Sequence, residues 1–330
     1  MTLDEIVRLL DEAGATNVFL LCHHNSDPDA VCSAFAFQGL LRKVRPEVQS
    51  EIGTVGVSKL TRNLLKYVPA LVNLRPTLEK AQAIILLDTN TIQQLDTLAD
   101  RVTRVKAPLI VIDHHSPHPE TQAIAKLCIT NEEATSTCDI IYKFFKEKDI
   151  KPDPDEAKAL FLGMAFDTRH FVLANSSTFK AVADLVDNGV NAQEALANLA
   201  LPMDFSERVA RVKACRRAKI VRIADWIIAL SHVSAFEASA ARALIDLGAH
   251  MSAVAGEKKD RIEISLRCTR EFTEKTGIHL GRDIAKPLGE SLQGQGGGHA
   301  MAAGVNGKGE LKACLKRCLR LLKENLREPE

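Results

Sequence analysis

The sequence is poor in aromatic residues, has no excess of either charge, and contains no long apolar run. Phe, Trp and Tyr make up 5% of its 330 residues, although aromatic side chains are what single-strand binding proteins use to stack bases. Its 43 Lys and Arg balance 42 Asp and Glu, whereas a protein that follows long nucleic acid carries a basic excess. We therefore expect no long duplex as a ligand, and a processive single-strand exonuclease is disfavoured.

Signals for membrane insertion and for paired-cysteine motifs are also missing from the sequence. No apolar run approaches the roughly 20 residues of a membrane span, and the acidic start MTLDEIVRLLDEAG differs from a signal peptide. The eight cysteines include no C-x-x-C pair, which disfavours a zinc ribbon or a redox motif. Many unpaired cysteines suit a reducing compartment. We predict a cytoplasmic protein with no membrane partner.

Three short apolar runs, each followed by a polar cluster, organise the first half of the chain. The runs at 17–22, 83–87 and 109–112 have the length and composition of buried strands, and the clusters HHNSDPD, DTN and DHH follow them. Helical patterns alternate with the runs, as in an open, mainly parallel α/β sheet. Such sheets bind ligands at the carboxyl ends of their strands, so the three clusters are expected to meet at one edge.

The second half changes from helical patterns to strands beyond about residue 218. These patterns predict a two-domain α/β protein. Its N-terminal domain, at 1–187, is expected to contain a mainly parallel sheet flanked by helices. A helical connector at 188–217 is expected to lead to a smaller α/β domain at 218–330.

Aspartates and histidines at the ends of four predicted elements are candidate metal ligands. Any one of these aspartates could simply cap a helix or a turn, but two adjacent histidines after an acid and a buried strand are harder to explain structurally. Carboxylate and imidazole ligands suit Mn²⁺, and also Mg²⁺, Co²⁺ or Zn²⁺. The set exceeds the needs of one tetrahedral zinc and fits two metals about 3.5–4 Å apart that share a carboxylate. It consists of His23, Asp27, Asp29, Asp88, Asp113, His114, His115 and Asp167.

Five motifs in order give the sequence a resemblance to the DHH phosphoesterase family. HHNSDPDA, LLDTN, VIDHH and GMAFDTRHF resemble its four N-terminal motifs, and QGGGHAMAAG, with ISLRC, resembles the DHH-associated C-terminal domain. The branch that it resembles contains nano-RNases, pAp phosphatases and cyclic-dinucleotide phosphodiesterases. The resemblance implies two divalent ions, with Mn²⁺ expected and Mg²⁺ or Co²⁺ as alternatives. It implies one metal on His23, Asp27 and Asp88, and a second on Asp29, Asp88, His114 and Asp167, with Asp88 bridging.

The resemblance also implies which residues act on the substrate phosphate. His115 matches the residue that faces the phosphate and protonates the leaving oxygen, and Asp113 matches a carboxylate that orients a ligand histidine. The fourth motif usually reads DTG, and here Arg169 replaces its glycine. Arg169 and His170 either contact substrate or are merely accommodated at the surface.

The C-terminal domain is expected to hold the substrate. In the alternating segment RIEISLR, Ser265 and Arg267 share the open face, where a guanidinium can bind phosphate in a bidentate manner. Gly296, Gly297 and Gly298 predict a loop whose N–H groups point toward a ligand, and His299 follows it. Metals on one domain and this clamp on the other imply a cleft that a short substrate spans.

Together with these features, the resemblance implies a Mn²⁺-dependent phosphoesterase for short oligoribonucleotides or small nucleotides such as pAp. Hydrolysis of cyclic di-AMP or linear dinucleotides is the alternative within the enzyme class. A family II pyrophosphatase shares the first four motifs but lacks the GGGH signature. A nucleotide-binding sensor with an inactive metal centre is disfavoured because every ligand position is filled. Whether the chain forms a homodimer is left open.

Overall fold

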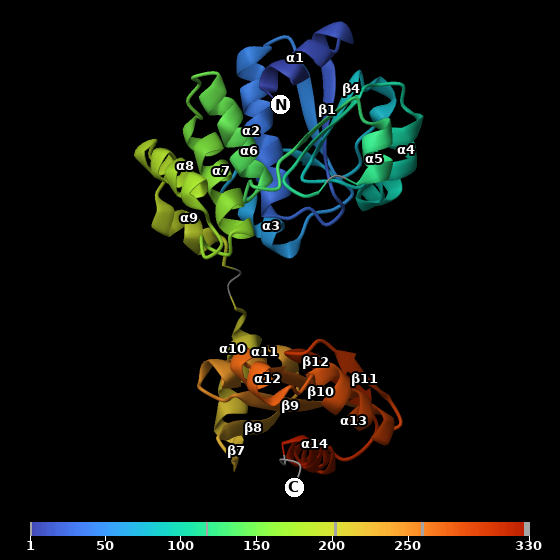
Figure 1. Cartoon of the computed structure of the whole chain (residues 1–330), viewed down its shortest axis with the longest axis vertical. Helices are drawn as coiled ribbons and strands as arrows, with labels where there is room; N and C mark the ends of the chain where they lie inside the picture. The colour runs from blue at the N-terminus through green and yellow to red at the C-terminus, as the bar shows by residue number, and fades with distance from the viewer. Residues whose placement is uncertain (1, 117, 201–202, 259–260, 327–330) are drawn as a thin grey trace. The chain divides into compact units, whose positions relative to one another are not determined.

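The chain consists of two compact units, residues 1–201 and 202–330. The computed structural model describes residues 2–116, 118–200, 203–258 and 261–326, and Figure 1 labels their helices and strands. Helix α9 (Ala192–Asn198) packs on the core of the first unit, whereas α10 (Phe205–Arg217) packs on the core of the second. The predicted connector at 188–217 is therefore divided between the units, because each of its two helices has an apolar side that joins a different core.

The first unit is built on a six-stranded parallel sheet in the order β3-β2-β1-β4-β5-β6. The three predicted strands are β1, β4 and β5, and they are adjacent at its centre. Their apolar runs are continuous because both faces of the sheet are covered. The strands are β1 (Asn17–Cys22), β2 (Gln49–Gly53), β3 (Val72–Asn73), β4 (Ala83–Leu87), β5 (Leu109–Asp113) and β6 (Leu127–Thr130). The predicted α/β class is confirmed.

Helices cover the two faces of this sheet with separate apolar cores. Alternate strand residues such as Leu20 and Leu87 pack beneath α2, α6 and α7, while Leu21 and Leu86 face the opposite core beside α4. Figure 1 shows α2, α6 and α7 together on one side of the sheet, with α4 and α5 on the other. The elements are α1 (Leu3–Glu12), α2 (Pro28–Val44), α3 (Lys59–Leu64), η1 (Leu78–Lys80), η2 (Ile92–Leu98), α4 (Ala99–Arg104), α5 (Pro119–Ile124), α6 (Thr137–Glu147), α7 (Pro154–Asp167) and α8 (Ser176–Asp187).

Local capping chemistry fixes where the helices nearest the predicted metal ligands begin. The carboxylate of Asp27 accepts a hydrogen bond from the Ala30 backbone amide at 3.1 Å, with Pro28 as the first residue of α2. The Ser136 hydroxyl accepts one from the Asp139 amide at 3.0 Å and starts α6. Each helix therefore begins at a defined residue of the loop that precedes it.

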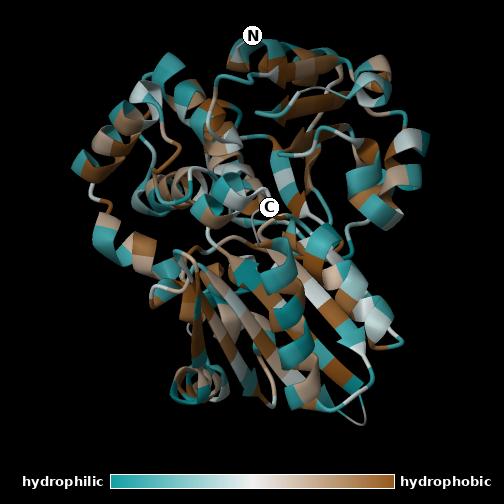
Figure 2. Cartoon of the chain, turned by 60° about the horizontal axis from the view of Figure 1, so that its bottom comes forward, coloured by the Kyte–Doolittle hydropathy of each residue, from teal (hydrophilic) through white to brown (hydrophobic). Residues whose placement is uncertain are grey.

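The second unit contains a mixed six-stranded sheet in the order β11-β12-β10-β9-β8-β7. Strands β8 and β9 are parallel, and the other neighbours are antiparallel. Ile262, Ile264 and Leu266 alternate toward the larger of its two cores. Figure 2 colours the chain by hydropathy and shows apolar and polar bands along the strands. The elements are β7 (Lys219–Ile223), β8 (Trp226–Val233), α11 (Glu237–Asp246), β9 (Met251–Lys258), β10 (Arg261–Cys268), α12 (Arg270–Thr276), η3 (Leu280–Ala285), α13 (Lys286–Ser291), β11 (Gln295–Gly298), β12 (Ala302–Gly307) and α14 (Leu311–Asn325).

None of the described helices combines the length and the apolar character that crossing a membrane requires.

Candidate metal centre

The ends of three adjacent strands bring the predicted ligands together. His23 follows β1, Asp88 follows β4, and Asp113 is the last residue of β5. Asp88 has a left-handed backbone, with φ of 53°, and its amide donates to the Ile112 carbonyl at 3.1 Å. A left-handed non-glycine residue costs conformational energy, and such residues cluster at functional sites. The turn after β4 thus holds the buried Asp88 carboxylate at the sheet edge.

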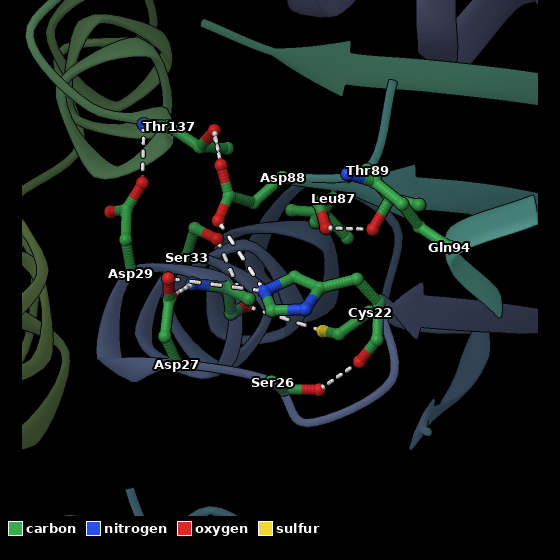
Figure 3. Close-up of polar contacts among 12 residues, drawn as sticks. Cys22, Ser26, Asp27, Asp29, Ser33, Leu87, Asp88, Thr89, Gln94 and Thr137 are labelled. Carbon is green, nitrogen blue, oxygen red and sulfur yellow. Dashed lines mark hydrogen bonds and ion pairs between the residues drawn. The ribbon is translucent and has the colours of Figure 1, made fainter. Parts of the chain in front are cut away.

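Asp88 lies at the centre of the ligand cluster. The Nε2 atom of His23 is 3.9 Å from a carboxylate oxygen of Asp27 and 3.9 Å from one of Asp88. On the other side, His114 Nε2 is 3.6 Å from Asp88 and 3.0 Å from Asp167. Figure 3 shows Asp27, Asp29 and Asp88 facing a common space from different parts of the chain.

The potential ligand atoms fall into groups that resemble the predicted division between two metals. In one group, ligand atoms of His23, Asp27 and Asp88 all lie within 4.8 Å of one another. The same limit holds for Asp29, His114 and Asp167. Asp88 also groups with Asp113 and the two histidines, so this residue contacts both halves of the cluster. The structure thus places all six predicted metal ligands together.

Asp113 orients His115. Its Oδ1 atom accepts hydrogen bonds from both the backbone amide of His115, at 2.9 Å, and the ring Nδ1, at 2.8 Å. The resemblance implies that this carboxylate orients a ligand histidine, but the turn after β5 directs it to the histidine predicted to face substrate. This hydrogen bond, opposed by partial burial, raises the pKa of His115 to about 9. The hydrogen bond to Asp113 therefore favours the cationic form of the ring.

Crowding of carboxylates makes the cluster electrostatically unfavourable by itself. Burial, followed by repulsion from Asp27, Asp113 and Asp167, raises the pKa of Asp88 to about 7. Burial and the charges of Asp167, Asp88 and Asp27 likewise raise the pKa of Asp29. Divalent cations would offset both the repulsion and the lost hydration.

His114 provides a second indication that the cluster fits metal ions. Its Nε2 atom is buried and forms no hydrogen bond of acceptable geometry, although Asp167 Oδ2 lies 3.0 Å away. Buried imidazole nitrogens ordinarily have a partner, and an imidazole nitrogen facing carboxylates is a suitable donor for Mn²⁺, Co²⁺ or Zn²⁺. The side chains present therefore fit bound divalent metal.

The start of α6 supports two of the carboxylates, a role that sequence reasoning missed. Asp29 accepts hydrogen bonds from the backbone amides of Thr137 and Cys138, at 2.7 and 3.0 Å. The Thr137 hydroxyl donates to Asp88 at 3.1 Å (Figure 3). The capping sequence around Ser136 was the available signal, because the amides at a helix N-terminus bind anions.

Gly163 allows α7 to pack directly beside this arrangement. A Cβ atom at this position would lie 2.2 Å from Cys138 Sγ and 2.7 Å from Asp29 Oδ1. Real Cβ atoms do not approach so closely, so any larger residue must displace α7, α6 or Asp29. Gly163, the first residue of the fourth motif GMAFDTRHF, thus has a packing role next to a predicted metal ligand.

The predicted substrate residues of the second unit lie on two strands and a turn. Arg267 is half-buried and Ser265 is buried on β10, opposite Ala302 and Gly304 of β12. His299 is exposed, and its backbone amide bonds to the Ala302 carbonyl at 2.8 Å.

The glycine-rich segment predicted as a loop is instead the edge strand β11, paired with β12. A Cβ atom on Gly296 would lie 1.8 Å from the Ala285 carbonyl oxygen, and one on Gly298 would lie 2.6 Å from the Ala302 oxygen. These two glycines therefore permit close backbone packing, which sequence alone could not distinguish from ligand approach. Gly297 faces open space instead.

Comparisons with known proteins agree with the motifs. The profile described as "DHH family, N-terminal domain" matches residues 17–164, and that of the DHHA1 domain matches 232–328. Uncharacterized protein MJ0988 of Methanocaldococcus jannaschii is 36% identical over 302 residues, which cover 91% of this chain and 90% of that protein. A probable manganese-dependent inorganic pyrophosphatase of Streptococcus thermophilus is 28% identical over 159 residues, or 46% of this chain and 48% of the relative.

A solved structure shares the fold over nearly the whole chain. An exopolyphosphatase-related protein from Bacteroides fragilis aligns with a TM-score of 0.62 at 19% identity, covering 98% of this chain and 96% of its own. At this identity the likeness concerns the fold alone.

Replacing Asp88 by Asn should separate the stability of the metal-free protein from metal binding. Asn tolerates the left-handed backbone and removes a buried, repelled charge, so metal-free Asp88→Asn should unfold at the same or a higher temperature than wild type. Stabilisation by added Mn²⁺ should be lost, because the central ligand is weakened. Thermal unfolding with and without Mn²⁺ measures both effects, with the exposed Asp225→Ala as control. Unchanged stabilisation by Mn²⁺ would contradict the proposed centre.

Gly163→Ala tests the packing of α7 beside Asp29. The added methyl group should lower stability by about 1–3 kcal/mol, as overpacking does, and weaken Mn²⁺ binding by about 10-fold or more. Calorimetric titration and denaturant unfolding would measure the two losses. Adding Cys138→Ala removes the nearest clash and should recover much of the stability, but Asp29 would remain displaced. Full recovery of metal affinity in the double variant would show that Asp29 is unaffected.

Proposed function

Because the chain belongs to the DHH family of metal-dependent phosphoesterases, we propose that it hydrolyses short oligoribonucleotides and small nucleotides such as pAp. The observation that carries this proposal is that all six predicted ligands, with Asp88 among them, lie close together. The same chain also contains a DHHA1 domain. The alignment with the pyrophosphatase relative covers 46% of this chain and 48% of that protein, so about half of each protein lies outside it. A difference in that half supports a substrate other than pyrophosphate.

We propose a pair of Mn²⁺ ions as the cofactor, with Mg²⁺ or Co²⁺ as alternatives. His23, Asp27 and Asp88 would hold one ion, and Asp29, Asp88, His114 and Asp167 the other. Such a pair supplies an activated water and stabilises the charge of an in-line displacement at phosphorus. The name of the pyrophosphatase relative specifies manganese, which supports the choice of metal.

His115 is the proposed general acid for the leaving oxygen. Asp113 accepts a hydrogen bond at Nδ1, which leaves Nε2 of the cationic ring as the available proton donor. The side chain is 56% exposed, so a substrate can reach it. In a phosphodiester, the proton would go to the 3′-oxygen as its bond to phosphorus breaks.

We propose that the second unit, residues 202–330, contributes further contacts to the substrate. Arg267, with Ser265 beside it on β10, would bind a phosphate of the same substrate. The open space at Gly297 and the exposed His299 would admit a neighbouring group of the ligand. His170 of the first unit is exposed and is a proposed phosphate contact. All eight cysteines are free, which is compatible with the cytoplasm as the proposed location.

A substrate panel with Mn²⁺ tests the proposed function against its alternatives. The panel contains pAp, pApA, cyclic di-AMP, pyrophosphate and RNAs of increasing length, with a chelated sample as control. We expect the highest kcat/KM on pAp or the shortest RNAs. Preference for cyclic di-AMP would favour the phosphodiesterase alternative, and preference for pyrophosphate would contradict a nucleotide substrate. Binding of nucleotides without any turnover would indicate a sensor.

His115→Ala should lower kcat by about 10²–10⁴-fold, the contribution typical of a general acid, while leaving Mn²⁺ binding nearly unchanged. This separation follows because His115 is held by Asp113 and is absent from the proposed ligand set. Single-turnover rates and metal content would be measured on the same preparation. Loss of a metal ion in the variant would instead make His115 a ligand.

Length selectivity should follow from the small set of substrate contacts. Since the chain has a net charge of only +1, a long RNA gains little further phosphate attraction. We expect kcat/KM to fall steeply between RNAs of about 2 and about 5 nucleotides, and Arg267→Ala to reduce it on the shortest RNA by about 10-fold or more. The exposed Arg270→Ala serves as the control. Equal or greater activity on an RNA of about 24 nucleotides would instead indicate a processive exonuclease.

A further inference from the structure

The turn that follows Asp167 contains a residue type that its backbone disfavours. Helix α7 ends with the Arg169 amide donating to the Phe166 carbonyl at 3.1 Å and the His170 amide donating to Ala165 at 2.7 Å. This pair of bonds is the Schellman motif, which requires a left-handed residue between helix and loop. Arg169 takes that position with φ of 51°. Glycine is usual there because any Cβ atom is strained.

Other helices of the chain end with the same two hydrogen bonds and allow a comparison. Glycine occupies the left-handed position after α1, α8 and α11, whereas α6 and α13 use an Asp and a Gln. These residues are Gly14, Gly189, Gly248, Asp149 and Gln293. Among the residues that the structure describes, the left-handed backbone continues for three successive residues only after α7.

The continued left-handed turn is held in place by the surrounding structure. His170 and Phe171 have φ of 57° and 68°. The Phe171 ring packs edge-on against Phe161, with centroids 5.2 Å apart, and its amide donates to the Thr168 hydroxyl at 3.0 Å. The Leu173 amide bonds to the Thr168 carbonyl at 2.9 Å. Strain that is stabilised in this way is characteristic of functional sites.

The Arg169 side chain is exposed. Among the residues that the structure describes, no carboxylate forms an ion pair with it. It follows Asp167 by two residues, and Asp167 Oδ2 lies 3.0 Å from His114 Nε2 in the metal cluster. Fold stability alone would be served better by glycine at this position.

We propose that Arg169 binds a phosphate group of the substrate beside the metal cluster, and that the strained turn holds its guanidinium there. This inference deepens the proposed function and rests on it. The planar guanidinium can donate two hydrogen bonds to adjacent phosphate oxygens. The first unit thereby supplies its own cationic phosphate contact, separate from Arg267 of the second unit.

Two substitutions distinguish the strain from the charge. Arg169→Gly removes both and should raise the unfolding temperature by about 2–4 °C, while weakening binding of inorganic phosphate in the presence of Mn²⁺ by about 10-fold. Arg169→Gln keeps a strained Cβ and removes the charge, so it should weaken phosphate binding equally without raising the unfolding temperature. Asp149→Gly changes the same backbone position after α6 and should leave phosphate binding unchanged.

Calorimetric titration with inorganic phosphate and thermal unfolding provide the two measurements. Wild-type phosphate affinity in both Arg169 variants, or no phosphate binding by the wild type, would overturn the inference. A lower unfolding temperature for Arg169→Gly would show that the turn is not strained. Because phosphate is not hydrolysed, these results do not depend on the nucleotide panel. Failure of every nucleotide in that panel would contradict the proposed function while leaving the phosphate contact of Arg169 standing.

Discussion

Repulsion among buried carboxylates around Asp88 is the constraint on which the arrangement of the first unit depends. A pKa of about 7 for Asp88, caused by burial and then by neighbouring acids, describes a site that is unfavourable until cations enter it. The N-terminal amides of α6 and the hydroxyl of Thr137 offset part of this cost. Divalent metal would offset the rest, so folding of this edge and metal binding are coupled.

The parallel sheet explains how residues from distant parts of the chain reach the site. Strands β1, β4 and β5 are adjacent and parallel, and their carboxyl ends therefore deliver His23, Asp88 and Asp113 to one edge. Helix α7 adds Asp167 from its C-terminal end, and Gly163 lets that helix approach. The catalytic chemistry proposed here thus depends on packing between α2, α6 and α7 as much as on the ligands themselves.

Much of this centre could be predicted from sequence because its ligands follow short apolar strands. The class of fold, the central strands and the candidate ligands at the strand ends came from that pattern, whereas the grouping of His23, Asp27 and Asp88 on one metal came from the resemblance to the DHH family. The partner of Asp113 could not be predicted, because Asp113 and His115 are brought together by the geometry of a turn. The support from Thr137 was missed because it depends on how α6 packs on α2. The edge strand β11 was predicted as a loop because its glycines indicate flexibility, although two of them allow close packing.

We propose that two metal ions share Asp88, and electron paramagnetic resonance of the protein during Mn²⁺ titration is the sharpest test of this sharing. We expect about two Mn²⁺ to bind per chain and the loaded protein to give the spectrum of a spin-coupled pair. Asp88→Asn should lose that coupling. A single Mn²⁺ per chain with the spectrum of an isolated ion would show that no metal pair forms at Asp88.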